Sequence, residues 1–140
     1  MNSDEIGHEY QEFIGEKLGF TNYQTADEQY NIGENKVGIE IKFDNNMKNT
    51  GNLFIETAEK RNADNERWIA SGIMRVDGCW GYLIGDYTEA YLFLKKHLKN
   101  LQAKYPFNFP IITIGVKTSR GFLLPKVKYA EKFKIWKYRF

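Results

Sequence analysis

The first regular pattern in the chain lies in residues 4–18, where apolar side chains recur every three or four positions. This spacing puts them on one face of a helix, and Gly19 follows at a position where helices commonly end. The glutamates of this segment fall beside the apolar face, with Glu9 and Glu16 nearest its edge. The pattern predicts an amphipathic helix, and we expect one of its carboxylates to point into a cleft.

A stricter alternation follows in residues 36–43, where every second side chain is apolar and where Glu40 and Lys42 lie between them. Such alternation predicts a strand with one buried face. Residues 20–32 are expected to be extended as well, and a short loop at residues 33–35 would join the two arms into a hairpin. Glu40 and Lys42 should therefore lie side by side on the polar face of this hairpin.

Short apolar runs predict four further strands, at residues 53–56, 80–84, 111–116 and 121–125. The charged stretch 58–68 predicts a loop or a solvated helical turn, and Ser71 can cap a short helix after it. Residues 88–102 carry an apolar stripe at helical spacing behind a capping Thr88, which predicts a second long helix. Together these elements predict an α/β fold with a central mixed β-sheet flanked by helices.

The size of the chain, 140 residues, suits one sizeable core, so residues 1–140 are expected to form a single domain. The single cysteine, Cys79, excludes an intrachain disulfide and a cysteine-based zinc cluster. The N-terminus has no signal-peptide pattern, and no apolar run approaches about 18 residues. We therefore expect a cytoplasmic protein without a membrane partner.

The charges are unevenly distributed along the chain. Residues 1–70 hold 7 Lys and Arg against 14 Asp and Glu, whereas residues 71–140 hold 13 against 4. An acidic pole can hold metal ions and a basic pole can neutralise phosphates, as a metal-dependent nucleic-acid enzyme requires. Solvated charge that serves solubility explains the composition equally well, so the chemistry has to be judged from particular residues.

Asp27 precedes Glu40 by 13 residues and would face it across the predicted hairpin. Two carboxylates with a nearby carbonyl suit Mg²⁺ or Mn²⁺, which take oxygen ligands. Lys42, on the same strand face, would orient a metal-bound water or offset charge on a phosphate. Glu-x-Lys by itself more often forms a surface ion pair, and only the added carboxylate indicates phosphodiester hydrolysis.

The order of these elements resembles the PD-(D/E)xK nuclease superfamily, with a glutamate on the first helix, an aspartate on a hairpin and Glu-x-Lys on the next strand. The stretches EIKFD, TGNLFIE, SGI followed by WGYLI, and GFLLP are similar to a group of small phage-type members, over roughly residues 8–125. The resemblance implies a restriction-endonuclease-like core. In that core Asp27 and Glu40 would bind Mg²⁺ or Mn²⁺, and Lys42 would be the catalytic lysine.

The resemblance also implies roles for further acidic residues. Glu9 would be the helix carboxylate that adjusts the site, and Glu12, one turn later, fits this role nearly as well. Glu56, which closes the run LFIE, would hold a second metal or a water. Ala26 stands where the family has a proline, which leaves two alternatives to Asp27, namely Glu28 and Asp44.

The function implied is hydrolysis of DNA phosphodiester bonds, either as a structure-selective endonuclease on branched DNA or as an exonuclease. Small members of the superfamily often act as dimers across two strands, which implies a homodimer here. Two other interpretations stay open: a non-catalytic nucleic-acid-binding protein that kept the nuclease fold, and a phage protein that binds a host enzyme.

The C-terminal segment is both basic and aromatic. Its cations can contact phosphates while its rings stack on unpaired bases, or it can be an edge strand whose aromatic side chains pack inward while its lysines discourage aggregation. The sequence supports the two interpretations about equally. The residues expected to bind nucleic acid are Lys126, Lys128, Lys132, Lys134, Trp136 and Lys137.

Overall fold

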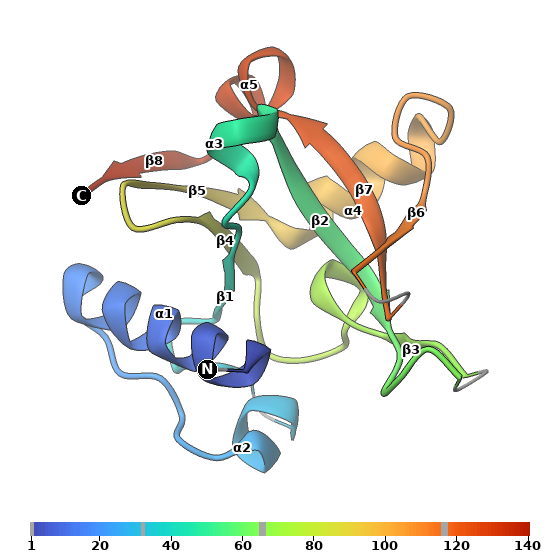
Figure 1. Cartoon of the computed structure of the whole chain (residues 1–140). Helices are drawn as coiled ribbons and strands as arrows, with labels where there is room; N and C mark the ends of the chain where they lie inside the picture. Colours follow the sequence, from blue (N-terminus) through green and yellow to red (C-terminus); the bar gives the residue numbers. More distant parts are fainter. Residues whose placement is uncertain (1, 32, 65–66, 116–117) are drawn as a thin grey trace. The chain divides into compact units, whose positions relative to one another are not determined.

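The computed structural model describes residues 2–31, 33–64, 67–115 and 118–140, and the chain divides into two compact units (Figure 1). The first unit comprises Met1–Asn45, Asp77–Lys95 and Phe133–Phe140, and the second comprises Asn46–Val76 and Lys96–Lys132. The predicted α/β class is confirmed. The strands, however, form two four-stranded sheets where one central sheet was expected.

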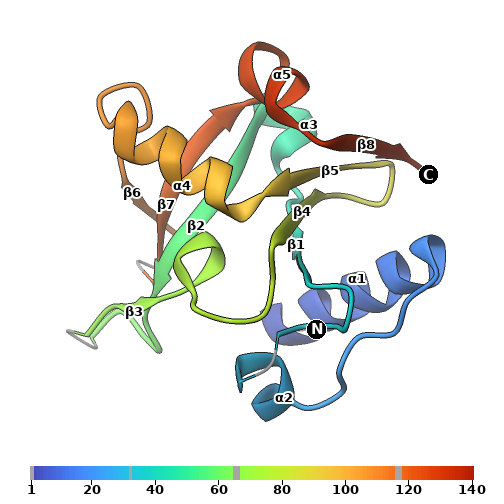
Figure 2. The same cartoon turned by 180° about the vertical axis from the view of Figure 1, so that it is seen from behind.

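The sheet of the first unit is mixed. Its strand order is β1 (Ile39–Phe43), β4 (Gly81–Gly85), β5 (Glu89–Leu94) and β8 (Trp136–Arg139). β1 runs parallel to β4, and the other neighbouring pairs are antiparallel. β1 and β8 are therefore the two edges of this sheet, which Figure 2 shows from behind.

Helix α1 (Ser3–Leu18) packs against one face of this sheet. It begins in a capping box, in which the Asn2 side chain accepts from the Glu5 N–H, and it ends at Gly19 in the left-handed conformation. Tyr10 and Ile14 are fully buried in one cluster with side chains of the sheet, among them Ile39, Ile41, Leu83 and Leu92. The helix predicted at residues 4–18 is thus confirmed to within one residue at its start.

Residues 20–31 are not the extended arm that the sequence pattern predicted, and residue 32 lies outside the described residues. Ala26–Asn31 form a short helix, α2, and an isolated bridge between Asn22 and Asn35 joins this region to the chain ahead of β1. The Thr25 hydroxyl accepts a hydrogen bond from the Glu28 N–H and donates one to its carboxylate. Hydrogen bonds of this kind stabilise the start of a helix, so these residues are helical although their apolar pattern favoured an extended arm.

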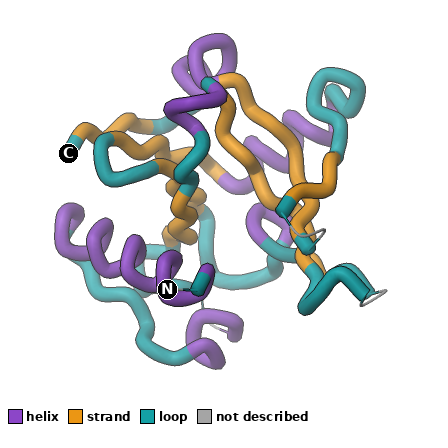
Figure 3. The backbone as a smooth tube through the Cα atoms, viewed as in Figure 1, coloured by secondary structure: helices purple, strands orange, loops and turns teal. Residues whose placement is uncertain are grey.

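Residues 88–102 are also not one helix. The first part is strand β5, and only Lys95–Lys104 form helix α4 (Figure 3). Thr88 lies in the turn between β4 and β5, where its N–H and hydroxyl donate to Asp86 Oδ1 at 2.8 and 2.7 Å. Ala90 to Phe93 are all buried in a sheet, and a continuous apolar run of this kind fits a central strand as well as a helix.

The sheet of the second unit is antiparallel, in the order β3 (Ile69–Ala70), β2 (Asn52–Glu59), β7 (Ser119–Pro125) and β6 (Ile112–Ile114). Buried side chains of its two central strands face each other, with Leu53 opposite Leu124 and Ile55 opposite Phe122. The four predicted strands at 53–56, 80–84, 111–116 and 121–125 are confirmed within the described residues, although Val116 lies outside them.

Short helical segments complete the chain: α3 (Met47–Thr50), a 3-10 turn at Gly72–Met74, a π-helix at Lys126–Ala130 and α5 (Glu131–Phe133). The helix expected after Ser71 is thus a single 3-10 turn, and the Ser71 side chain makes no capping hydrogen bond. Along the described ranges, no helix combines the length and apolarity needed to span a membrane.

Candidate functional site

Strand β1 presents Glu40 and Lys42 on the face of the sheet that α1 does not cover. Successive side chains of a strand point to opposite faces, and Ile39 and Ile41 pack under α1. Glu40 is 1% exposed, whereas a third of the Lys42 side chain reaches solvent. Lys42 Nζ lies 3.8 Å from Glu40 Oε2, so the two predicted residues form an ion pair that is open on the lysine side.

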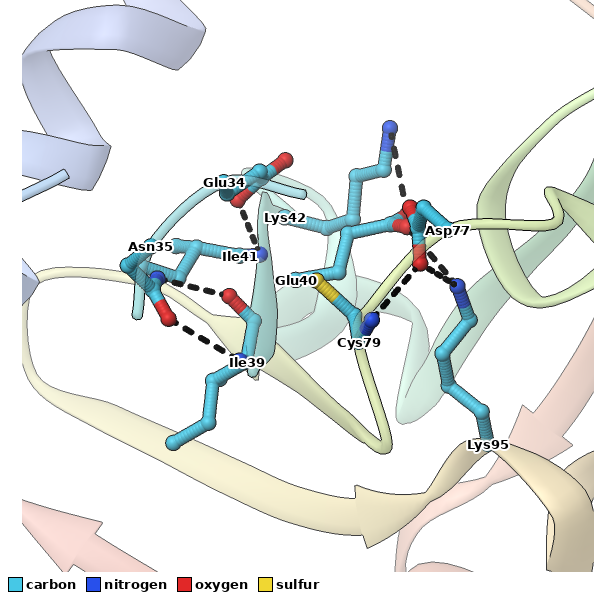
Figure 4. A network of polar contacts seen from close by, with 9 residues as sticks. All are labelled: Glu34, Asn35, Ile39, Glu40, Ile41, Lys42, Asp77, Cys79 and Lys95. Atoms are coloured by element: carbon cyan, nitrogen blue, oxygen red, sulfur yellow. Dashed lines mark hydrogen bonds and ion pairs between the residues drawn. The ribbon is translucent and has the colours of Figure 1, made fainter. Parts of the chain in front are cut away.

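A second lysine lies deeper beside Glu40 (Figure 4). Lys95 Nζ is 3.2 Å from Glu40 Oε1 and 3.3 Å from Asp77 Oδ1, and all three side chains are almost wholly buried. Lys95 directly follows β5, and its N–H donates to the carbonyl of Trp80 just ahead of β4. The pairing of the strands therefore brings this lysine to the glutamate of β1.

Hydrogen bonds to the backbone hold the carboxylates of this site in place. Asp77 Oδ1 accepts from the Cys79 N–H at 2.9 Å, which fixes the turn that leads into β4. The buried Glu34 carboxylate accepts from the Ile41 N–H at 2.6 Å, on the strand that carries Glu40. Two of the three acidic groups, Glu34 and Asp77, are therefore fixed by the main chain of β1 and of the turn ahead of β4.

The acidic groups surround the only cysteine. Burial raises the pKa of the Cys79 thiol to about 11, and the nearby carboxylates of Asp77, Glu34 and Glu40 contribute to the rise. Each of these carboxylates opposes the formation of a thiolate next to it. Cys79 is thus an unreactive thiol in a site of negative electrostatic potential. It is no candidate nucleophile.

We expect Cys79 to react with iodoacetamide at pH 8 about a hundredfold more slowly in the folded protein than in urea. At a pKa of about 11 the thiolate fraction at this pH falls by about two orders of magnitude from that of an ordinary cysteine. Because Cys79 is the only cysteine, total alkylation followed by mass spectrometry measures this rate directly. Equal rates in the folded and unfolded states would show that the site is open.

One carboxylate oxygen of the site, Glu40 Oε2, is contacted only at long range by a cation, since Lys42 Nζ lies 3.8 Å from it. No described residue donates a hydrogen bond to Glu40 Oε2, which is buried. A buried carboxylate oxygen without a donor is costly unless a proton or a cation satisfies it.

The structure does not place Asp27 on a hairpin arm opposite Glu40. Asp27 is exposed on α2, because the arm expected to place it opposite Glu40 is a helix. The described part of the chain brings no group of three or more His, Cys, Asp or Glu side chains together in a metal-binding arrangement. Of the two alternatives to Asp27, Glu28 is bound to Thr25, and Asp44 is buried two positions beyond Lys42.

Glu9 lies on the helix that covers the opposite face of the sheet from Glu40. Glu9 is exposed. The pKa of the Tyr87 phenol is raised, first by burial and second by the nearby Glu9 carboxylate. The ring of Tyr87 packs against Tyr10. Glu12, the alternative, is exposed one turn later and lies 3.6 Å from His8. The placement of a helix carboxylate beside Glu40 is therefore corrected, since α1 packs on the wrong side of β1.

Glu56 belongs to the second unit, where it accepts a hydrogen bond from the Ser119 hydroxyl at 2.9 Å. Its role as a ligand of a second metal stays a prediction. The sequence analysis missed Asp77, Glu34 and Lys95 altogether. The available signals were an Asp-Gly turn just ahead of a strand and a lysine that ends a continuous apolar run.

The basic tail is distributed over both units. Lys126, Lys128 and Lys132 lie in the second unit, while Lys134, Trp136 and Lys137 lie in the first. β8 is an edge strand, as one interpretation expected, but its Trp136 is 62% exposed and does not pack inward as that interpretation also expected. Lys137 is engaged within the sheet, 3.4 Å from Glu89 and over the ring of Tyr91. Contact with nucleic acid stays a prediction for these residues.

Comparisons of the chain with protein-family models, with curated proteins and with solved structures give no match. The chemistry of the site is therefore argued from its own geometry: a buried carboxylate with an unsatisfied oxygen, a second buried carboxylate beside it, and one accessible lysine on the same strand.

Proposed function

We propose that this protein is a metal-dependent nuclease of the PD-(D/E)xK type, with a restriction-endonuclease-like core, that hydrolyses DNA phosphodiester bonds. One observation carries the proposal: Glu40 and Lys42 share a strand face, with the Glu40 carboxylate buried and its Oε2 lacking a hydrogen-bond donor among the described residues. A charge of this kind is costly to bury and contributes nothing to stability that an apolar side chain could not match, which favours a functional role.

The donor set suits Mg²⁺, with Mn²⁺ as a substitute. Mg²⁺ keeps several of its waters and is commonly held by one or two carboxylates together with substrate phosphates, so a larger cage is unnecessary. Glu40 and Asp77 supply two buried carboxylates that approach a common cation, the Lys95 ammonium. In this proposal Asp77 takes the place that the sequence assigned to Asp27. A divalent cation held there supplies Lewis-acid activation of water.

The protein's own side chains divide the remaining work between them. Lys42 is accessible enough to meet a phosphate, and its ammonium offsets the negative charge that builds up on the phosphate during attack. Lys95 is a positioning residue, because it holds Glu40 and Asp77 at a fixed separation without reaching solvent. The acidic groups are thus kept in place before the substrate arrives.

Cleavage of DNA should therefore require a divalent cation. We expect Mg²⁺ or Mn²⁺ to support cleavage and EDTA to abolish it, because the two carboxylates cannot activate water without a Lewis acid. The assay compares supercoiled plasmid, linear duplex, single-stranded DNA and a four-way junction, each with metal and with EDTA. Preference for the junction, together with a dimer in sedimentation, would support a structure-selective endonuclease that acts across two strands.

Cleavage that persists in EDTA would contradict the proposal, as would the absence of cleavage with every substrate and metal. The position of Lys95 favours a second candidate, a non-catalytic nucleic-acid-binding protein. Its ammonium already lies between Glu40 and Asp77, as in a purely structural ion-pair network. DNA binding with no turnover in either metal would select this candidate.

A further inference from the structure

A tryptophan in the second unit, Trp68, has two cations against its ring. The guanidinium carbon of Arg120 lies 4.0 Å from the centroid of the indole ring, and Lys60 Nζ lies 4.7 Å from it. Arg120 is exposed, and Lys60 and Trp68 are half-buried. We call these three residues the Trp68 cluster. They come from three different strands or strand extensions, so the cluster is a product of the sheet.

The strand register explains how the three side chains meet. Ala58 of β2 pairs with Ala70 of β3 on one side and with Arg120 of β7 on the other. When the β2–β3 register is continued by two residues along each strand from the Ala58–Ala70 pair, Trp68 falls opposite Lys60. Arg120, Ala58 and Ala70 thus form one row across the sheet, and Lys60 and Trp68 follow in the next row on the same face.

A β-bulge determines which residue of β2 faces Arg120. The register shifts between Glu56 and Ala58, so that Ala58 lies opposite Arg120 where an unbroken ladder would place Thr57 there. Because side chains alternate along a strand, this shift also turns Lys60 to the face of Arg120. Without the bulge the two cations would point to opposite faces of the sheet.

The Trp68 cluster brings two positively charged side chains to one ring. Within the described ranges, neither Lys60 nor Arg120 forms an ion pair. Their unit holds 13 Lys and Arg against 5 Asp and Glu, whereas the unit of Glu40 holds 7 against 13. Two like charges against one ring repel each other, and an anion that contacts both relieves the repulsion.

The stacked arginine is already arranged for an anion. A guanidinium that lies against an aromatic ring keeps its N–H groups in its own plane, directed away from the ring, where they can bind a phosphate through two parallel hydrogen bonds. Stacking on Trp68 also restricts the arginine before binding, which lowers the entropy cost of forming the contact.

We propose that the Trp68 cluster is a binding site for the phosphates of a nucleic-acid backbone. It is separate from the Glu40 site, which lies in the other unit, and it was not among the basic residues expected from the sequence. The proposed function supplies the choice of DNA as the ligand. Binding in EDTA nevertheless tests the cluster without any cleavage, so failure of the nuclease proposal and failure of this one are distinguishable.

The test is the salt dependence of DNA binding, measured by fluorescence anisotropy on a labelled duplex in EDTA. Each phosphate contact contributes about 0.9 to the slope of log K against log salt concentration. We expect the double variant Lys60→Met with Arg120→Met to lower this slope by about 1.8. The ratio of wild-type to variant affinity should therefore fall about tenfold when the salt concentration rises from about 50 to about 200 mM.

Lys48→Met is the matched control, because Lys48 is exposed on α3, ahead of the opposite end of β2. It should leave the slope within about 0.3 of the wild-type value. Arg120→Lys should keep the slope but weaken binding several-fold, since the charge stays and the planar contact is lost. Thermal melting checks that each variant is folded.

Three results would overturn the inference. One is an unchanged slope in the folded double variant, and another is an equal change in Lys48→Met. The third is binding of the wild-type protein to vesicles with anionic lipids and not to DNA. A reduced slope in the double variant would support the site whether or not the protein cleaves DNA.

Discussion

Replacement of Lys42 by alanine is expected to lower the rate of DNA cleavage by at least about a hundredfold while the protein stays folded. Lys42 is the one accessible cation on the face of β1 that carries Glu40, and it can offset charge on a phosphate. Its loss should change the free energy of unfolding by less than about 1 kcal/mol, because a partly exposed ion pair contributes little. Single-turnover cleavage with Mg²⁺ and thermal melting measure the two effects.

The control for this variant is Lys36→Ala. Lys36 is exposed in the turn ahead of the same strand, so the Lys36→Ala substitution removes an equal charge nearby and leaves Glu40 unchanged. It should cleave within about twofold of the wild type. Lys42→Ala purified in parallel also detects a contaminating nuclease, because such a contaminant would cleave equally in both preparations. A folded Lys42→Ala protein with wild-type activity would remove Lys42 from the mechanism.

Replacement of Lys95 by methionine should cost about 3–5 kcal/mol of folding free energy at neutral pH. Methionine keeps much of the length of the side chain, but it leaves Glu40 and Asp77 buried beside each other without the ammonium that lies 3.2 and 3.3 Å from them. Urea denaturation measures this deficit in the free energy of unfolding.

Lys96→Met is the matched control, since Lys96 is the next residue along α4 and is exposed. It should change the free energy of unfolding by less than about 0.5 kcal/mol. Addition of Asp77→Asn to Lys95→Met should restore part of the lost stability, because one of the two unbalanced charges is removed. A Lys95→Met protein as stable as the wild type would contradict the buried ion-pair network.

Several elements follow from local sequence alone. The apolar spacing and the stop at Gly19 were sufficient for α1, and strict alternation was sufficient for β1 and for the faces that its side chains occupy. The sequence also identified Glu40 and Lys42 as neighbours, because residues two apart on a strand share a face whatever else the fold does. Where local signals conflicted, as in Thr25–Glu28 and residues 88–94, the predicted element was wrong.

The partners of Glu40 were decided by the tertiary structure. Lys95 is 55 residues away in sequence, and it meets Glu40 because β1 pairs with β4 and β4 with β5. The Trp68 cluster likewise depends on the register of three strands and on one bulge. Periodicity determines which face of its own element a side chain takes, and strand pairing determines what it meets there. The sequence by itself therefore determined the Glu40–Lys42 pair, and only the sheets decided which charges surround it.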